Sequence, residues 1–199
     1  YVSYLWRVNG GTTSALNDGD INATGQINQT HGCGVLLYTG DGGSSNVTMA
    51  HGMGKKPEFL WMKDRDSNGN NNQWGAWHTS MQDDYYMYLS LDSAEAASGN
   101  GSIDTSNVTD SLLAWLRTST TGGSQTRFEN GDNFIIYQFF GVEGHSKFGS
   151  YEGNGNADGA FVYTGFSPAF IMVKSIDSTS DWEMYDNVRA GYNENNDQL

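Results

Sequence analysis

Hydrophobic residues alternate with polar residues, or run together over a few positions, in short segments along most of the chain, and Gly, Asn, Asp or Ser residues separate these segments. Both arrangements are typical of β-strands, because successive side chains of a strand face opposite sides of the sheet and central strands are buried on both sides. The pattern predicts strands near residues 1–8, 33–39, 46–51, 57–63, 73–79, 84–91, 111–117, 133–141, 147–151, 159–164, 168–174 and 181–186. No segment shows the apolar stripe of an amphipathic helix. We therefore predict an all-β chain that folds as an antiparallel β-sandwich of the jelly-roll type.

One sequence block occurs twice in the chain. Residues 57–67 and 168–178 share Pro, Phe, Lys, Asp and Ser at matching positions, and a Trp follows each block. The shared scaffold positions are Pro57, Phe59, Lys63 and Trp74 in the first copy and Pro168, Phe170, Lys174 and Trp182 in the second. The copies lie 108 to 113 residues apart, which is about the length of a small sandwich domain. We interpret the chain as tandem repeats of one unit, and the shared residues as its packing skeleton.

The ends of the repeats can be estimated from the same alignment. The opening segment resembles the strand predicted at 133–141, because Tyr4 aligns with Tyr137 and Trp6 with Phe139. We expect residues 1–8 to be the final strand of a preceding repeat, residues 9–32 a linker or loop, residues 33–141 a complete repeat, and residues 142–199 the first half of a second, incomplete repeat. Both ends of the chain are thus expected to cut through folded repeats.

Composition limits the possible partners. The net charge is −13 and no run of Lys or Arg occurs, so binding to nucleic acid or to an anionic membrane is not expected. No apolar run approaches the roughly 20 residues of a membrane-spanning helix. The single cysteine, Cys33, excludes an intrachain disulfide and is interpreted as a small buried residue.

One loop has part of a calcium-binding pattern. Residues 64–70 match the first half of the D-x-[DN]-x-[DN]-G motif, in which alternating oxygen ligands wrap one cation. The candidate ligands are Asp64, Asp66, Asn68 and Asn70. The second half of the motif fails, because Gly75 stands where the bidentate Glu is expected. The same residues suit an ordinary solvated hairpin turn, so calcium and a plain turn are both retained, and no other cofactor is expected.

Catalytic motifs are lacking. The sequence has no G-x-S-x-G motif, no His-x-x-x-His pair and no second cysteine. The nearest pair of strand acids, Glu183 and Asp186, is spaced so that the two face opposite sides of a strand, which does not suit a glycoside hydrolase. We predict no catalytic residue and no enzyme activity.

Aromatic side chains offer the other candidate ligand contacts, since Tyr and Trp rings can either anchor a core or stack on sugar rings. The residues selected as possible sugar contacts are Tyr85, Tyr86, Tyr88 and Trp77.

Three segments carry a resemblance to a known family. They are Trp-Arg-Val-Asn-Gly-Gly-Thr-Thr at residues 6–13, Gly-Met-Gly-Lys-Lys-Pro at residues 52–57, and Val-Glu-Gly-His-Ser-Lys-Phe-Gly-Ser-Tyr-Glu-Gly-Asn-Gly-Asn-Ala-Asp-Gly at residues 142–159. They resemble a repeat module of tail-fibre and other virion structural proteins of marine bacteriophages, and the resemblance extends over essentially the whole chain. It implies concanavalin-A-like or laminin-G-like jelly rolls and supplies no catalytic motif.

The resemblance and the repeats together predict a function. We expect a non-catalytic virion structural protein, in a tail fibre or surface appendage on the outside of the particle, that forms homo-oligomers and contacts other virion proteins. Its loops could engage a glycan of the bacterial surface. The alternative is a secreted or cell-surface bacterial module that binds carbohydrate like a lectin. A sandwich-fold glycan hydrolase is the third and least favoured class.

Overall fold

A computed structural model of the chain describes residues 7–8, 11–66, 73–97, 100–117 and 128–187. The described part forms β-strands and one short 3₁₀ helix, η1 (Thr105–Asn107), which confirms the predicted all-β class. The strands are β1 (Ser14–Leu16), β2 (Ala23–Asn28), β3 (Cys33–Thr39), β4 (Val47–Ala50), β5 (Phe59–Asp64), β6 (Gly75–His78), β7 (Tyr85–Tyr88), β8 (Ala96–Ala97), β9 (Asn100–Ile103), β10 (Leu112–Arg117), β11 (Asn133–Phe139), β12 (Phe170–Val173) and β13 (Glu183–Asp186). No helix in these ranges is long and apolar enough to cross a membrane.

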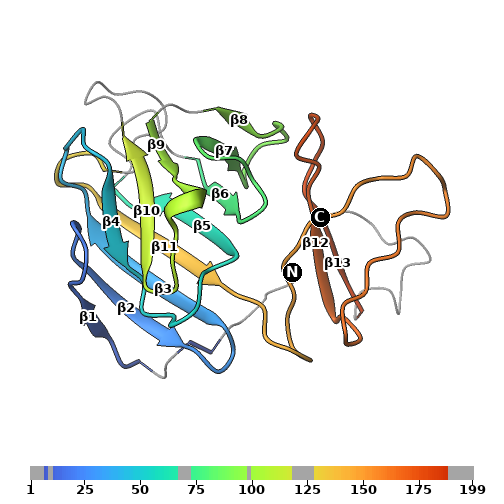
Figure 1. Ribbon diagram of the computed structural model, residues 1–199, viewed down its shortest axis with the longest axis horizontal. Coiled ribbons are helices and arrows are strands. Elements are labelled where there is room, and N and C mark those ends of the chain that lie inside the picture. Colours follow the sequence, from blue (N-terminus) through green and yellow to red (C-terminus); the bar gives the residue numbers. More distant parts are fainter. Residues whose placement is uncertain (1–6, 9–10, 67–72, 98–99, 118–127, 188–199) are drawn as a thin grey trace.

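Two sheets form the main body. An eight-stranded sheet has the order β1-β2-β3-β11-β5-β6-β7-β8, and a three-stranded sheet has the order β4-β10-β9. Figure 1 shows the smaller sheet lying across one face of the larger one. Side chains from both sheets are fully buried between them, namely Leu36, Leu60 and Ile136 from the larger sheet and Met49, Leu113 and Trp115 from the smaller. The pairing is antiparallel, so the predicted β-sandwich is confirmed.

Strand β11 is the centre of the larger sheet. Its Ile136 lies opposite Leu36 of β3 on one side and Met62 of β5 on the other. The opposite face of the same strand is also partly covered, since the rings of Phe139 and Phe148 stack at 5.9 Å. Burial on both faces explains why this segment reads as a nearly continuous apolar run.

The prediction that residues 9–32 form a linker or loop is wrong for the described part of that range. Strands β1 and β2 lie there, and β2 pairs with β3 along its whole length. The alternation of hydrophobic and polar residues over β2 is weak in the sequence, because two small residues, Ala23 and Gly25, occupy inward positions of this strand. A Cβ atom at Gly25 would lie 2.8 Å from a methyl carbon of Leu36 and 3.1 Å from the Val35 carbonyl oxygen, so a larger residue would require the Leu36 side chain to shift.

Most of the other predicted strands are confirmed within a few residues. The segments 147–151 and 159–164 are exceptions, because they contain no strand. Residues 159–164 correspond in the repeat to β4, which pairs with β10, and no described strand lies beside them to provide hydrogen bonds. The predicted strand at 1–8 falls largely outside the described residues, and β8 and β9 were not predicted.

The sequence repeat has a structural counterpart. Phe59 of β5 lies opposite His78 of β6, and its repeat equivalent Phe170 lies opposite Asp186 in the β12–β13 hairpin. The two hairpins therefore have the same register. Residues 142–187, with β12 and β13, are referred to below as the second unit, and β1 to β11 as the first unit.

The second unit packs against the β7–β8 end of the first. Trp182 is 9% exposed, and its Nε1 donates a hydrogen bond to the Tyr88 carbonyl at 2.8 Å. Two backbone hydrogen bonds flank this ring, from Glu95 N to the Ile176 carbonyl at 2.9 Å and from Ser180 N to the Asp92 carbonyl at 2.8 Å. The loop that joins β12 to β13 is thus fixed to the first unit.

Candidate functional site

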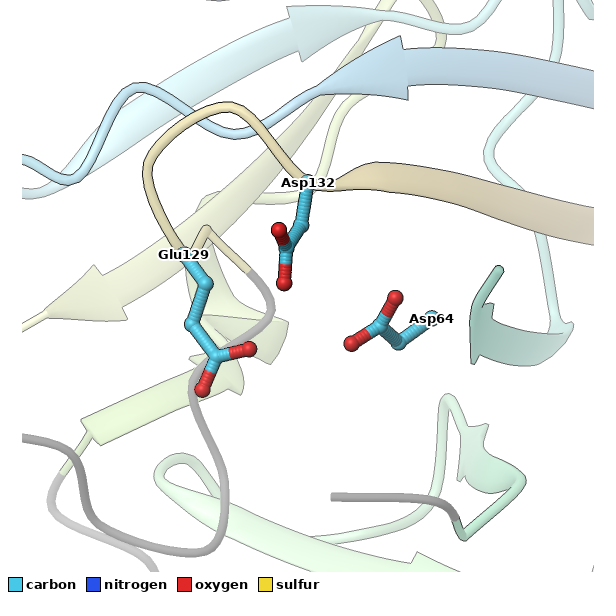
Figure 2. Close-up of side chains that lie close together, drawn as sticks. All are labelled: Asp64, Glu129 and Asp132. Carbon is cyan, nitrogen blue, oxygen red and sulfur yellow. The ribbon is translucent and has the colours of Figure 1, made fainter. Parts of the chain in front are cut away.

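Three carboxylates converge at one end of the larger sheet. Asp64 is the last residue of β5, and Glu129 and Asp132 lie in the turn before β11 (Figure 2). Each offers an oxygen, and these atoms lie within 4.8 Å of one another. Asp64 is only 3% exposed, so one of these charges lies in the protein interior.

The turn before β11 positions two of the acids. Asp132 N donates to the Glu129 carbonyl at 3.1 Å, and Gly131 N donates to the Gly40 carbonyl at 3.0 Å. Gly131 has a φ of +84°, a conformation that glycine adopts without the steric cost of a Cβ. Directly after the turn, Phe134 pairs with Asp64, and this brings the end of β5 beside the turn.

The predicted calcium loop is only partly described. Asp64 Oδ1 accepts a hydrogen bond from Asp66 N at 2.8 Å. Asp66 Oδ2 accepts two more, from Asn133 N at 2.7 Å and Asn133 Nδ2 at 2.9 Å, so this oxygen fixes the start of β11. Asn68 and Asn70 lie outside the described residues. Of the two predicted ligands that the structure describes, Asp64 and Asp66, Asp64 belongs to the carboxylate cluster.

The cluster has oxygens suited to a hard cation. Calcium takes six to eight oxygen ligands at about 2.3–2.6 Å, and three carboxylates can supply up to six. Glu129 and Asp132 were not selected from the sequence, because Asp64 and the 129–132 turn are far apart along the chain. Only the pairing of β5 with β11 brings them together, and no local motif signals that pairing.

Two of the predicted sugar contacts are core residues, and for these the prediction is corrected. Trp77 is 1% exposed, and its Nε1 donates to Thr105 Oγ1 at 2.9 Å. Tyr88 is 8% exposed, with its carbonyl bound by Trp182. Their rings point to the interior because hydrophobic burial outweighs exposure for large aromatic groups. Tyr85 and Tyr86 are half-buried, and the Tyr86 ring meets that of Tyr88 edge to face at 5.1 Å.

A second aromatic group lies on the face of the larger sheet that points away from the smaller sheet, called the outer face here. Alternation along β11 places Tyr137 on it, opposite Trp61 of β5. Trp74, which precedes β6, packs its ring 5.9 Å from that of Tyr137. All three side chains are half-buried, and Leu37 on the same face is 38% exposed. The outer face therefore presents aromatic rings to solvent.

The shared repeat positions fall in different surroundings in the two units. In the first unit, the two buried positions are Pro57 and Phe59, and the two half-buried positions are Lys63 and Trp74. In the second unit only the Trp position, Trp182, is buried, and the other three are half-buried, namely Pro168, Phe170 and Lys174. Lys174 Nζ donates to the Ser175 carbonyl at 2.6 Å, and burial lowers the pKa of this amine although Asp92 and Asp181 oppose the shift. The hairpins keep their register while their neighbours differ.

The buried histidine His51 has a structural role. Its Nδ1 accepts from Met53 N at 3.1 Å, its Nε2 lies 3.1 Å from the Thr109 carbonyl, and its own carbonyl accepts from Gln138 Nε2 at 2.7 Å. These contacts connect the end of β4 both with the segment before β10 and with β11. Burial lowers the pKa of His51, with partial opposition from the Thr109 hydrogen bond and from Asp110. A neutral imidazole with both nitrogens engaged is a packing element and not a free base.

Comparison with known proteins identifies a family. Residues 1–199 match the family model described as a domain of unknown function, DUF7483, and the chain belongs to this family. No curated protein and no solved structure matches the chain. The family description assigns no activity, so the function has to be argued from the residues and the geometry.

Proposed function

We propose that this member of the DUF7483 family is a non-catalytic structural protein of a bacteriophage particle, in a tail fibre or surface appendage built from tandem β-sandwich units. The observation that supports it best is the repeated hairpin. The second unit copies the register of β5–β6 and is fixed to the first unit by Trp182 and two backbone hydrogen bonds. Such a junction suits an extended appendage, whose length depends on units joined in a defined orientation.

The junction is of a kind that can be repeated. It joins a hairpin loop of one unit to a different surface, the β7–β8 end, of the other. A contact between two unlike surfaces leaves one of each surface at the ends of the pair, so that further units can add in the same way. This is the contact expected in an array, and it agrees with the resemblance to tail-fibre modules.

Glycan binding is the second part of the proposal, and the outer face is the place for it. Trp74 and Tyr137 are half-buried neighbours whose rings could stack on a sugar, with Lys63 and Trp61 beside them on β5. The net charge of −13 disfavours an anionic polysaccharide. We therefore propose neutral sugars, bound by stacking and hydrogen bonds.

The proposal is tested first by the genes around the coding sequence. Tail and capsid genes on both sides are the expected result. A bacterial chromosomal setting among secretion or cell-wall genes would instead support the lectin-like bacterial module, and it would overturn the phage assignment.

A glycan array with the purified chain tests the adhesive part. We expect binding to neutral oligosaccharides of bacterial envelopes and loss of that binding in Trp74→Ala. Tyr151→Ala is the matched control, because Tyr151 is an aromatic residue 54% exposed on the second unit. Equal binding by both variants would exclude the outer face, and absence of binding by the wild-type chain would leave a purely structural role.

A further inference from the structure

Two exposed histidines from distant parts of the chain meet beside the connection between the two units. His31 lies in the turn between β2 and β3, and His145 lies in the turn that follows β11. Their rings meet edge to face, with centroids 5.4 Å apart. No local motif signals this contact, because the two residues come together only where the chain leaves β11 for the second unit (Figure 1).

The turns that carry the two histidines pack closely against each other. Phe140 N donates a hydrogen bond to the Gly32 carbonyl at 2.9 Å, directly after His31. Gly32 has a φ of +63°, and a Cβ atom there would overlap the Phe140 carbonyl oxygen and lie 2.9 Å from Cγ2 of Val142. His145 N donates to the Val142 carbonyl at 2.9 Å, which closes the second turn. The backbone therefore holds both side chains within reach of one another.

Asn28 determines which nitrogen of His31 can bind a ligand. Its Nδ2 donates to the Arg7 carbonyl at 3.2 Å, so its Oδ1 is the acceptor end of the amide. This oxygen accepts a hydrogen bond from His31 N at 3.1 Å and lies 3.2 Å from His31 Nδ1. Because an amide oxygen only accepts, Nδ1 carries the proton, and the lone pair of Nε2 can bind a metal ion. Metal-binding histidines commonly donate their other ring N–H in this way.

The separation of the two rings fits one shared ion. Zinc binds imidazole nitrogen at about 2.0–2.1 Å, so two imidazoles on one tetrahedral ion have ring centroids about 5 Å apart. The observed separation of 5.4 Å is close to this value, and a small rotation of either ring reaches it. Both side chains are exposed, so nothing in their burial opposes such a rotation.

We propose that His31 and His145 bind one Zn²⁺ ion, with one nitrogen ligand from each turn. Imidazole suits zinc and copper, whereas Ca²⁺ and Mg²⁺ take oxygen ligands, so the ligand is a divalent transition metal. Water can complete the tetrahedron, as it does in zinc sites with an open position. Glu143, an exposed residue in the same turn as His145, adds a negative charge that favours a cation.

Such an ion would add a second connection between the units. His31 belongs to the first unit and His145 to the second, so the ion would fasten the start of the second unit to the β2–β3 turn. This connection would be separate from the hydrogen bond of Trp182 to the Tyr88 carbonyl. The inference rests on the geometry of the two turns and does not depend on the assignment to a virion.

Zinc titration of the purified, untagged chain tests the site. Calorimetry is expected to show a binding event whose affinity falls at least tenfold in His31→Gln and in His145→Gln. His78→Gln is the matched control and should leave the affinity unchanged, because His78 lies on β6 and its Nδ1 contacts Ser80. Glu129→Gln should also leave this event unchanged, which separates it from binding at the carboxylate cluster.

Copper counts the nitrogen ligands directly, because Cu²⁺ binds such sites more tightly than Zn²⁺. With one equivalent of Cu²⁺, the electron paramagnetic resonance spectrum is expected to show coupling to two imidazole nitrogens in wild type and to one in each histidine variant. Unchanged zinc affinity in either variant, or coupling to fewer than two nitrogens in wild type, would overturn the shared site. A complex of two chains per ion, seen by light scattering, would assign the nitrogens to different chains and would also overturn it.

Hydrogen exchange tests whether the ion holds the two turns together. The amides of His145 and Ser146 are expected to exchange about tenfold more slowly when free Zn²⁺ is ten times its dissociation constant. This protection should be lost in His31→Gln, which leaves the 142–146 turn itself unaltered. Equal exchange with and without zinc in wild type would contradict an ion shared by the two turns.

Discussion

Trp182 donates a hydrogen bond through Nε1 to the carbonyl of Tyr88 at 2.8 Å, and this bond joins residues 94 positions apart in the sequence. The indole belongs to a repeat position of the second unit, whereas the acceptor is the last residue of β7 in the first unit. One side chain therefore serves both the repeated hairpin and the junction between units.

Trp182→Ala is expected to release the second unit from the first. Loss of a buried Trp costs about 3–5 kcal/mol where the cavity cannot collapse, and here the cost falls on the junction. Hydrogen exchange should increase in β12 and β13, and limited proteolysis should cut between residues 140 and 170, while the melting of the first unit stays unchanged. Trp182→Phe keeps the apolar ring but loses the donor, so a loss of about 1 kcal/mol is expected. Equal protection of β12 in wild type and Trp182→Ala would contradict the junction.

Acidification is expected to destabilise the first unit below about pH 6.5. Burial lowers the pKa of His51 and of His78 from the ordinary value of 6.5, so the unfolded chain takes up protons before the folded one does. The contribution of these histidines is complete above pH 6.5 and is lost as the pH falls through their folded-state pKa values. Urea unfolding at pH 8, 7, 6 and 5 should give a constant free energy down to pH 7 and then a decline approaching 1.4 kcal/mol per pH unit for each proton.

His51→Gln removes one of these two titrating groups and so separates its contribution from that of His78. Gln can retain a donor and an acceptor near Met53 and Thr109 but does not titrate. The decline of the free energy of unfolding between pH 6.5 and 5 should therefore become shallower, by up to about 1.4 kcal/mol per pH unit, which is the contribution of one proton. His145→Gln, at an exposed histidine, is the control. A slope in His51→Gln identical to that of wild type would show that His51 is not a source of the pH dependence.

The carboxylate cluster makes a prediction about stability. Three acids with oxygens within 4.8 Å repel one another when ionised, so Glu129→Gln is expected to stabilise the chain by about 1 kcal/mol in EDTA. Glu152→Gln, at an exposed acid of the second unit, should change the stability by less than about 0.5 kcal/mol. Destabilisation by Glu129→Gln in EDTA would mean that its carboxylate makes contacts stronger than the repulsion.

Repeating the melts in millimolar calcium tests the calcium interpretation, which predicts a higher Tm for wild type and a smaller increase for Glu129→Gln.

The Arg117–Asp41 pair is expected to fasten β10 to the loop after β3. Arg117 is 5% exposed, pairs with Asp41, and lies 4.7 Å from the centroid of the Phe128 ring. Asp41→Asn should cost about 2 kcal/mol, the usual range for a hydrogen bond to a charged group. Asp158→Asn, at an exposed acid of the second unit, is the control. A change below 0.5 kcal/mol in Asp41→Asn would mean that the remaining bonds of Arg117, to Ser45 and Asn46, suffice.

The all-β class could be predicted from the sequence because β3, β5, β10 and β11 carry strong apolar patterns. The hairpin formed by β12 and β13 could also be predicted, since Phe170 and Trp182 repeat Phe59 and Trp74 in order. Strand β2 was missed because Ala23 and Gly25 give little hydrophobic signal. The close approach of Leu36 favours a small residue at position 25, and this contact between neighbouring strands cannot be seen from the hydrophobic pattern of β2 alone.

The candidate site was less predictable than the fold. Asp64 could be selected from the loop pattern, but Glu129 and Asp132 reach it only through the pairing of β5 with β11. Trp77 was selected as a sugar contact because alternation along a strand does not indicate which face is inward. Its burial depends on the smaller sheet, which is assembled from segments far apart in the chain.

Immunogold labelling of intact phage particles tests the proposed function most directly. Antibodies raised against the purified chain are expected to label a tail fibre or other appendage, on the outside of particles that have not been disrupted. Labelling of the bacterial surface in uninfected cells, with particles left unlabelled, would contradict the assignment to the virion.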